Sequence, residues 1–206
     1  MTTPLSRPKR KDPTKRTRIP SLPPGKRSRE AHGLTAMAAV GRFALQVCNE
    51  CQKVQYPPRQ ICSNCLNDKL FWRDVNNGGK LLAETKLQHS NDTYFRDRVP
   101  WKLGIVIADA GPSIVAHLGE DCIRDQRVRM SLSIDRAGNA VITARPEKPT
   151  QLEEDDVQLR EMAFNPKDRR VLIVDGKTEL GLRIAENMVA AGARDVFVGS
   201  AEPWRS

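Results

Sequence analysis

The sequence predicts a mainly β chain: a disordered basic N-terminal tail, a zinc ribbon, a five-stranded barrel of the OB type, and an incomplete β-α-β, Rossmann-like unit. Three observations predict this fold class: two Cys-x-x-Cys pairs, a series of short strand-like segments separated by turns, and a late succession of apolar strand, helix and strand. The expected boundaries are tail 1–30, ribbon 34–69, barrel 70–146, acidic linker 147–168 and β-α-β unit 169–206.

The basic character of the chain is concentrated at its N-terminus. Residues 1–30 hold ten Lys and Arg residues and only two acidic residues, Asp12 and Glu30, so they account for most of the net charge of +9. This segment is rich in proline and has few apolar residues, so it cannot bury enough surface to offset its ordering entropy. We expect a disordered extension that either solubilises the chain or binds polyanions non-specifically.

Four of the five cysteines form two pairs with the spacing of metal ligands. Two residues separate Cys48 from Cys51 and Cys62 from Cys65, and ten residues separate the two pairs. Two such pairs complete a closed tetrahedral shell around Zn²⁺, which leaves no position for water or substrate. We therefore predict a structural zinc ion, with redox disulfides as the alternative. Thiols kept reduced for a metal indicate a cytoplasmic protein.

The region after the ribbon has the pattern of a small β-barrel. Five segments have β-branched or alternating apolar residues and are separated by turns: 80–87, 101–108, 113–118, 127–134 and 140–144. Five short strands without a long helix fit a barrel of the OB type. Within it we expect Cys122 to be a packed thiol and His117 to be a solvent-facing or hydrogen-bonded strand residue.

The end of the chain follows a different pattern. Residues 170–175 form an apolar strand, residues 180–191 have helical spacing up to the helix stop Gly192, and residues 195–199 form a second strand. Together they predict one β-α-β unit, which cannot cover both faces of its own sheet.

The ribbon carries a more specific pattern than its cysteines alone. A Q-x-C-x-x-C element at residues 46–51 is followed by Y-P-P-R at residues 56–59 and by C-x-x-C at residues 62–65. This order resembles a bacterial and archaeal family first catalogued as a domain of unknown function, which joins a rubredoxin-like zinc ribbon to a C-terminal OB fold. The resemblance extends over residues 34–146, where comparable features are Trp72, Gly78-Gly79-Lys80, Pro100, Ile105-Val106-Ile107 and Val128.

The resemblance implies a non-catalytic accessory module of lipid, steroid or acyl-CoA metabolism. Members of this family associate with thiolase-fold or aldolase enzymes; the barrel is thought to bind acyl-CoA and the ribbon to contact the enzyme. The nearly balanced charge of residues 70–146, with eleven basic and nine acidic side chains, favours this function over a groove that follows a polynucleotide. The alternative is a nucleic-acid-binding zinc-ribbon and OB protein that uses the basic tail as an arm.

Aromatic and basic residues in the barrel are the candidates for ligand contacts. They would stack on the adenine of CoA, bind its phosphates or line an acyl channel. The candidate ligand-binding residues are Tyr94, Phe95, Arg96, Arg98 and Trp101. For Trp101, packing in the core is the simpler interpretation.

The C-terminal unit resembles the start of a short-chain dehydrogenase. Residues 171–174 correspond to its first strand and residues 181–192 to the following helix, with Gly176 and Gly181 as the candidate cofactor-binding glycines. Glu179 in this loop would repel a pyrophosphate, and the chain lacks the Tyr-x-x-x-Lys pair of that family. The second alternative is therefore the N-terminal part of a fused NAD(P)-dependent dehydrogenase.

No catalytic constellation can be assembled from the sequence. It contains no Ser-His-Asp order, no paired catalytic carboxylates and no Walker loop, so the chain is not predicted to be an enzyme by itself. It also has no run of eighteen apolar residues, and no membrane partner is expected.

Overall fold

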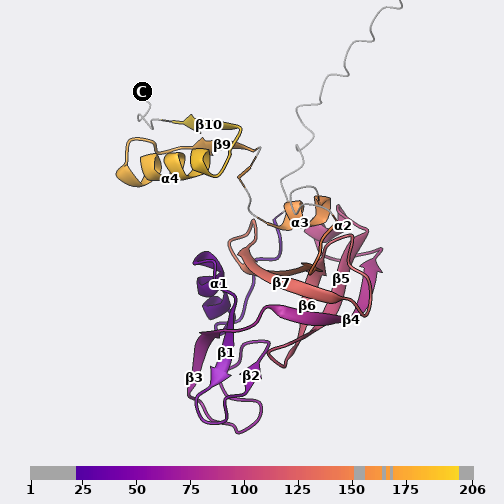
Figure 1. The fold of residues 1–206 in the computed structure, drawn as a ribbon. Helices are drawn as coiled ribbons and strands as arrows, with labels where there is room; N and C mark the ends of the chain where they lie inside the picture. The colour runs from indigo at the N-terminus through magenta and orange to yellow at the C-terminus, as the bar shows by residue number, and fades with distance from the viewer. Residues whose placement is uncertain (1–21, 151–155, 164–165, 168, 200–206) are drawn as a thin grey trace, which may run out of the picture.

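The computed structural model describes residues 22–150, 156–163, 166–167 and 169–199 and has the predicted mainly β architecture (Figure 1). A small sheet is followed by a closed barrel, a short helix and a β-α-β unit. The predicted fold class is confirmed for these parts. Residues 1–21 of the predicted tail lie outside the described residues.

The small sheet belongs to the ribbon and contains three antiparallel strands in the order β2-β1-β3. The central strand β1 (Ala44–Cys48) is buried along its whole length, and it pairs with β2 (Val54–Gln55) on one edge and β3 (Leu70–Asp74) on the other. The sequence pattern assigns the chain from residue 70 onward to the barrel. The structure instead pairs all of β3 with β1, so the ribbon sheet continues to Asp74.

Five strands form the closed barrel: β4 (Gly78–Leu87), β5 (Trp101–Ala108), β6 (Ser113–Leu118), β7 (Arg127–Ile134) and β8 (Ala140–Pro146). Their order is β4-β5-β6-β8-β7, and β7 returns to β4. All neighbours are antiparallel except β6 and β8, which are parallel. The five predicted strands and their barrel are thereby confirmed.

Alternate residues of the barrel strands point inward and form the core. Leu81, Val106, Ile114 and Val128 come from four different strands and are fully buried. Burial of each such aliphatic side chain contributes about 1.5–3 kcal/mol. A shift of β5 by one residue would exchange Val106 for Ile105, which faces outward, and the core therefore fixes the strand register.

Two short helices cover one end of the barrel. α2 (Thr93–Arg96) connects β4 to β5, and α3 (Val157–Met162) follows β8 (Figure 1). The Asp156 side chain begins α3 by accepting a hydrogen bond from the amide of Leu159 at 3.0 Å. Because Leu159 and Met162 are buried, this part of the predicted acidic linker packs on the barrel.

The segment before the ribbon also lies against the body of the protein. Pro23 is buried, and the guanidinium of Arg27 lies 3.6 Å from the carboxylate of Asp135, in the turn between β7 and β8. α1 (Ala31–Ala39) follows and contacts β7 and β8. The last nine residues of the predicted tail therefore have defined positions.

The C-terminal part forms the expected β-α-β unit. β9 (Arg170–Ile173) and β10 (Asp195–Val198) are parallel, and α4 (Glu179–Ala190) connects them. Ile173 is buried, whereas Leu172 and its partner Phe197 are 68% and 55% exposed. One face of the small sheet is therefore uncovered, as the pattern predicts. None of the helices in the described residues is long and apolar enough to cross a membrane.

Gly104 in β5 provides a test of the barrel packing. A Cβ atom at this position would lie 2.6 Å from the carbonyl oxygen of Ala83, a backbone atom that cannot move aside without disturbing β4. We expect Gly104→Ala to lower the free energy of unfolding by about 1–3 kcal/mol, measured by urea denaturation. Gly25→Ala is the control, because its Cβ meets no atom within 4 Å. Equal midpoints for both variants would contradict this packing.

Candidate functional site

Two matching turns of the ribbon bring the four predicted ligands together. The amide of Gln52 donates to the carbonyl of Cys48 at 3.0 Å, and the amide of Leu66 donates to that of Cys62 at 3.1 Å. Gln52 and Leu66 each follow the second cysteine of a pair, and both have a left-handed backbone, with φ of 56° and 60°. Residues other than glycine adopt this conformation rarely, so the two turns are specialised in the same way.

The sulfur positions fit one tetrahedral metal ion. All four Sγ atoms lie within 4.8 Å of one another, and the distances Cys48–Cys65 and Cys51–Cys62 are both 3.5 Å. With Zn–S bonds of about 2.3 Å, sulfur atoms at the corners of a tetrahedron are about 3.8 Å apart. A disulfide needs about 2.05 Å, and all four thiols are free. The four cysteines form a structural zinc site.

The described residues contain no other group of three or more His, Cys, Asp or Glu side chains with metal-ligand geometry. No histidine or carboxylate joins the four thiols in that group. Four soft sulfur ligands are typical of structural Zn²⁺ sites. They fill the tetrahedral shell and leave no coordination position for water or a substrate. The zinc would therefore hold the two turns together.

Two buried glutamines tie the second cysteine turn to the sheet. Oε1 of Gln46 accepts from the side chain of Gln55 at 3.1 Å and from the amide of Arg59 at 2.8 Å. Oε1 of Gln55 accepts from the amide of Ser63 at 3.0 Å. These bonds explain why a glutamine stands in the Q-x-C element. The sequence showed Gln46 only through a resemblance and gave no signal for Gln55.

A cavity of about 280 Å³ lies on the outer face of the barrel, between β5, β6, α2, α3 and residues 24–27. Apolar side chains form most of its wall, so we call it the apolar pocket: Leu87, Phe95, Trp101, Leu103, Val115 and Met162. The remaining lining residues are Pro24, Arg27, Ser90 and His117.

His117 is the half-buried imidazole of the apolar pocket. Nε1 of Trp101 donates to its Nδ1 at 2.8 Å, so the hydrogen-bonded alternative of the sequence prediction is confirmed. Burial lowers the pKa of His117 to about 4, and the positive charge of Arg27 acts in the same direction. The imidazole is therefore neutral at pH 7 and carries its proton on Nε2.

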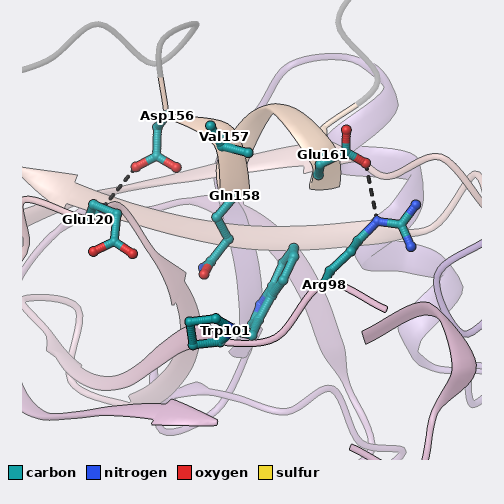
Figure 2. Close-up of a pocket in the computed structure, with 8 residues that line it drawn as sticks. Arg98, Trp101, Glu120, Asp156, Val157, Gln158 and Glu161 are labelled. Atoms are coloured by element: carbon teal, nitrogen blue, oxygen red, sulfur yellow. Dashed lines mark hydrogen bonds and ion pairs between the residues drawn. The ribbon is translucent and has the colours of Figure 1, made fainter. Parts of the chain in front are cut away.

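A second cavity, of about 430 Å³, shares Trp101 with the first (Figure 2). We call it the acidic pocket, because Glu120, Asp156 and Glu161 line it together with a single basic residue, Arg98. Nε of Arg98 lies 3.2 Å from Glu161, and the Asp156 carboxylate accepts from the amide of Glu120 at 2.8 Å. Glu161 also pairs with Arg136 at 3.2 Å and Glu120 with Lys86 at 2.9 Å, so Arg98, the cation in the lining, is already engaged by a carboxylate and offers little to a phosphate group.

The five candidate ligand residues have different environments. Tyr94 is 1% exposed and its hydroxyl donates to the carbonyl of Glu161 at 2.7 Å, so its ring is not available to stack on a base. Trp101 is 2% exposed and packs in the core, yet it borders both pockets. Arg98 lies over the ring of Tyr94 and is paired with Glu161. Contact with a ligand stays a prediction for these two residues and for Phe95 and Arg96.

The two candidate glycines of the C-terminal unit are explained by packing. A Cβ at Gly176 would overlap the side chain of Val198, and one at Gly181 would overlap the carbonyl of Asp175. The amide of Gly181 donates to Oγ1 of Thr178 at 3.1 Å, which uses one of the free amides at the start of α4. Binding of a dinucleotide by Gly176 and Gly181 stays a prediction, as does the resemblance of this unit to a short-chain dehydrogenase.

The fold and the cysteine cluster define a zinc-ribbon protein that also contains a β-barrel of the OB type. Residues 35–70 match the model of a family described as the ChsH2 rubredoxin-like zinc ribbon domain. This match confirms the resemblance predicted for the ribbon.

Two solved structures match the chain. One, described as an Ltp2-ChsH2(DUF35) aldolase, is 17% identical, with a TM-score of 0.51 over 59% of this chain and 97% of that chain. Another is a DUF35-family protein of unknown function from Sulfolobus solfataricus, 8% identical, with a TM-score of 0.42 over 56% and 84% of the two chains. No curated protein matches the sequence. At 17% identity the likeness to the first structure concerns the fold alone.

Replacement of one ligand should release the metal. We expect Cys51→Ser to lose the zinc and to unfold the ribbon locally, because metal binding supplies folding free energy there. Zinc content of the purified chain, measured by mass spectrometry of the metal, should fall from one ion per chain to near zero. Cys122→Ser is the matched control, since this buried thiol donates to the carbonyl of Ala144 and lies outside the cluster. Full zinc content in Cys51→Ser would refute the four-cysteine site.

The neutral His117 should make stability depend on pH. Its folded pKa of about 4 lies below the ordinary value of 6.5, so the unfolded chain takes up a proton first as the pH falls. The free energy of unfolding therefore decreases between pH 6.5 and pH 4, by roughly 3 kcal/mol from this residue. His117→Phe should have a shallower slope in urea denaturation at pH 6.5, 5.5 and 4.5, even if it is less stable throughout. Parallel curves would show that His117 is not the group responsible.

Proposed function

We propose that this chain is a non-catalytic accessory module that binds acyl-CoA and associates with a thiolase-fold or aldolase enzyme. Its main support is the ribbon, whose residues 35–70 match the ChsH2 zinc ribbon family. The ribbon and the barrel also have the fold of a chain from a structure described as an Ltp2-ChsH2 aldolase. A closed four-sulfur site without an open metal position agrees with an accessory role.

An exposed apolar surface on the barrel supports association with a protein. Leu82, Ile105, Ile107 and Val115 point outward from β4, β5 and β6 and are 40–58% exposed; we call them the outer barrel face. Ile105 and Val115 are direct cross-strand partners, so they form one continuous patch. Outward positions of a solvated sheet are normally polar, and a contiguous apolar patch marks an interaction surface.

The ribbon offers a second surface of the same kind. Ile61 and Leu66 lie beside the cysteine turns and are 47% and 71% exposed. They agree with the expectation from the family that the ribbon contacts the enzyme. We propose that the enzyme covers the ribbon tip and the outer barrel face.

The acyl-CoA part of the proposal is supported by the apolar pocket, which has the concave apolar lining of a ligand site. The nucleic-acid alternative has less support within the described residues. Several barrel cations are paired with carboxylates there, and the shortest of these pairs are Lys80–Asp125, Lys86–Glu120 and Arg127–Asp109 at 2.7–2.9 Å. Paired cations contribute little to counterion release on a polynucleotide.

Affinity purification of the full chain from nuclease-treated native lysate tests this function. We expect a thiolase-fold or aldolase enzyme to be recovered, and equally well after deletion of residues 1–21. The deletion stops there because residues 22–30 contact the barrel. Salt-sensitive binding of RNA or DNA that disappears with the deletion, without any such enzyme, would establish the nucleic-acid alternative instead.

Single substitutions by glutamate test the two proposed surfaces one at a time. Ile105→Glu in the outer barrel face and Leu66→Glu at the ribbon tip should each reduce recovery of the enzyme at least tenfold, because a buried unpaired carboxylate is costly in an interface. Val40→Glu is the control, since Val40 is 64% exposed at the end of α1 and belongs to neither surface. Full recovery with Leu66→Glu would remove the ribbon from the interface.

A further inference from the structure

The charge of the apolar pocket selects for an uncharged group. Among its described lining residues, Arg27 is the one ionised side chain, and its guanidinium is already engaged. Nη1 donates to the carbonyls of Pro24 and Lys26 at 2.7 Å and 3.0 Å, and Nη2 lies 3.6 Å from Oδ2 of Asp135. An anion that entered the pocket would lose its hydration without gaining a free cation.

His117 provides one directed hydrogen bond in this apolar surrounding. Its Nδ1 accepts from Trp101, and its neutral ring lies nearly parallel to that of Phe95, with ring centroids 6.1 Å apart and planes 14° from parallel. Nε2–H is the remaining donor, and none of the described residues accepts from it. His117 lines the cavity, and its Nε2 is not among the buried polar atoms that lack a partner, so an oxygen acceptor on a bound ligand would replace water at this donor.

Residues 24–27 form one wall of the pocket and are fixed by a buried carboxylate. Oδ1 of Asp135 accepts from the amides of Ala137 and Asn139 at 2.8 Å and 2.9 Å, which holds the turn between β7 and β8. Its Oδ2 makes no hydrogen bond within the described residues and faces Arg27. The ion pair therefore attaches the wall to the barrel, and the neighbouring Pro23 is buried.

The volume limits the size of the ligand group. At about 30 Å³ for each water-sized group, a cavity of about 280 Å³ holds roughly nine non-hydrogen atoms. An octanoyl group, with eight carbons and one oxygen, has this size. The pocket opens beside the exposed Val115, so the remainder of a longer ligand would lie outside it.

We propose that the apolar pocket binds an uncharged acyl group of about eight carbons, with Nε2 of His117 donating to an oxygen of that group and residues 24–27 closing one side. The assignment of this group to an acyl-CoA rests on the proposed function. The pocket itself would bind an uncharged acyl thioester even without the CoA moiety.

Isothermal titration calorimetry of the zinc-loaded full chain tests the pocket with three probes: S-octanoyl-N-acetylcysteamine, octanoyl-CoA and CoA. The first probe is an uncharged thioester without a nucleotide. Val115→Trp should fill the pocket from its exposed side and weaken binding of the uncharged probe at least tenfold. Ser113→Trp is the matched control on the same strand and the same outward face, outside the pocket lining, and should bind like the wild type. His117→Phe should weaken binding about three- to tenfold, through the lost hydrogen bond.

The outcomes separate the pocket from the proposed function. Binding of the uncharged probe that depends on Val115 supports the pocket, even where octanoyl-CoA binds no more tightly than CoA, which would refute only the acyl-CoA function. Octanoyl-CoA that binds more tightly than CoA, with equal affinity in the wild type and in Val115→Trp, would overturn the pocket and leave the function standing. An unchanged affinity in His117→Phe would overturn the role of its Nε2. Absence of binding of both octanoyl probes to the wild type would overturn both proposals.

Discussion

The barrel and both pockets depend on a short closure between β6 and β8. These strands meet in parallel over two register pairs, His117–Thr143 and Leu118–Ala144, whereas the antiparallel pairs around the rest of the barrel are longer. Gln158 from α3 reinforces this end of the barrel: its Oε1 accepts from the amide of Lys102 at 2.6 Å, and its Nε2 donates to the carbonyls of Lys102 and Leu118 at 2.7 Å and 3.1 Å. Because these backbone groups are buried, loss of the amide would leave them unsatisfied at about 1–3 kcal/mol each. Together with the burial of Leu159 and Met162, this side chain fixes the position of α3, which places Met162 in the apolar pocket.

Buried polar side chains also bind backbone groups in two loops of the molecule. In the ribbon, Gln46 and Gln55 hold the segment that carries Cys62 and Cys65, and in the barrel Asp135 holds the turn that meets Arg27. In each case a buried polar side chain bonds to backbone amides of a loop, which would otherwise carry unsatisfied groups into the interior. The glutamine bonds position the second turn, and the metal then supplies the remaining folding free energy by joining the two turns. This explains how sulfur atoms from distant parts of the sequence come within 4.8 Å of one another.

Local patterns predicted the parts of the molecule that depend on local chemistry. The cysteine spacing encodes the bite of each metal turn, and alternation such as that of residues 127–134 encodes a strand with one buried face, so both were predicted correctly. The docking of α3 was not predicted, because Gln158 and its hydrogen-bond partner Lys102 are 56 residues apart in the sequence. Residues 22–30 were assigned to the disordered tail on composition, which contains no information on the carboxylate of Asp135. The apolar pocket was missed for the same reason, since its lining comes from residues 24 to 162.

Trp101 borders two pockets that both lack a strong site for an anion, and this constrains how a charged ligand would lie. The apolar pocket favours an uncharged group, and in the acidic pocket Arg98 is already paired with Glu161. An acyl-CoA with its acyl group in the first pocket must therefore direct its phosphates away from the second. Phe95 lines the apolar pocket, and the exposed Arg96 follows it at the end of α2. A path along α2 would bring the phosphates to this exposed cation, on the same short helix that the sequence singled out.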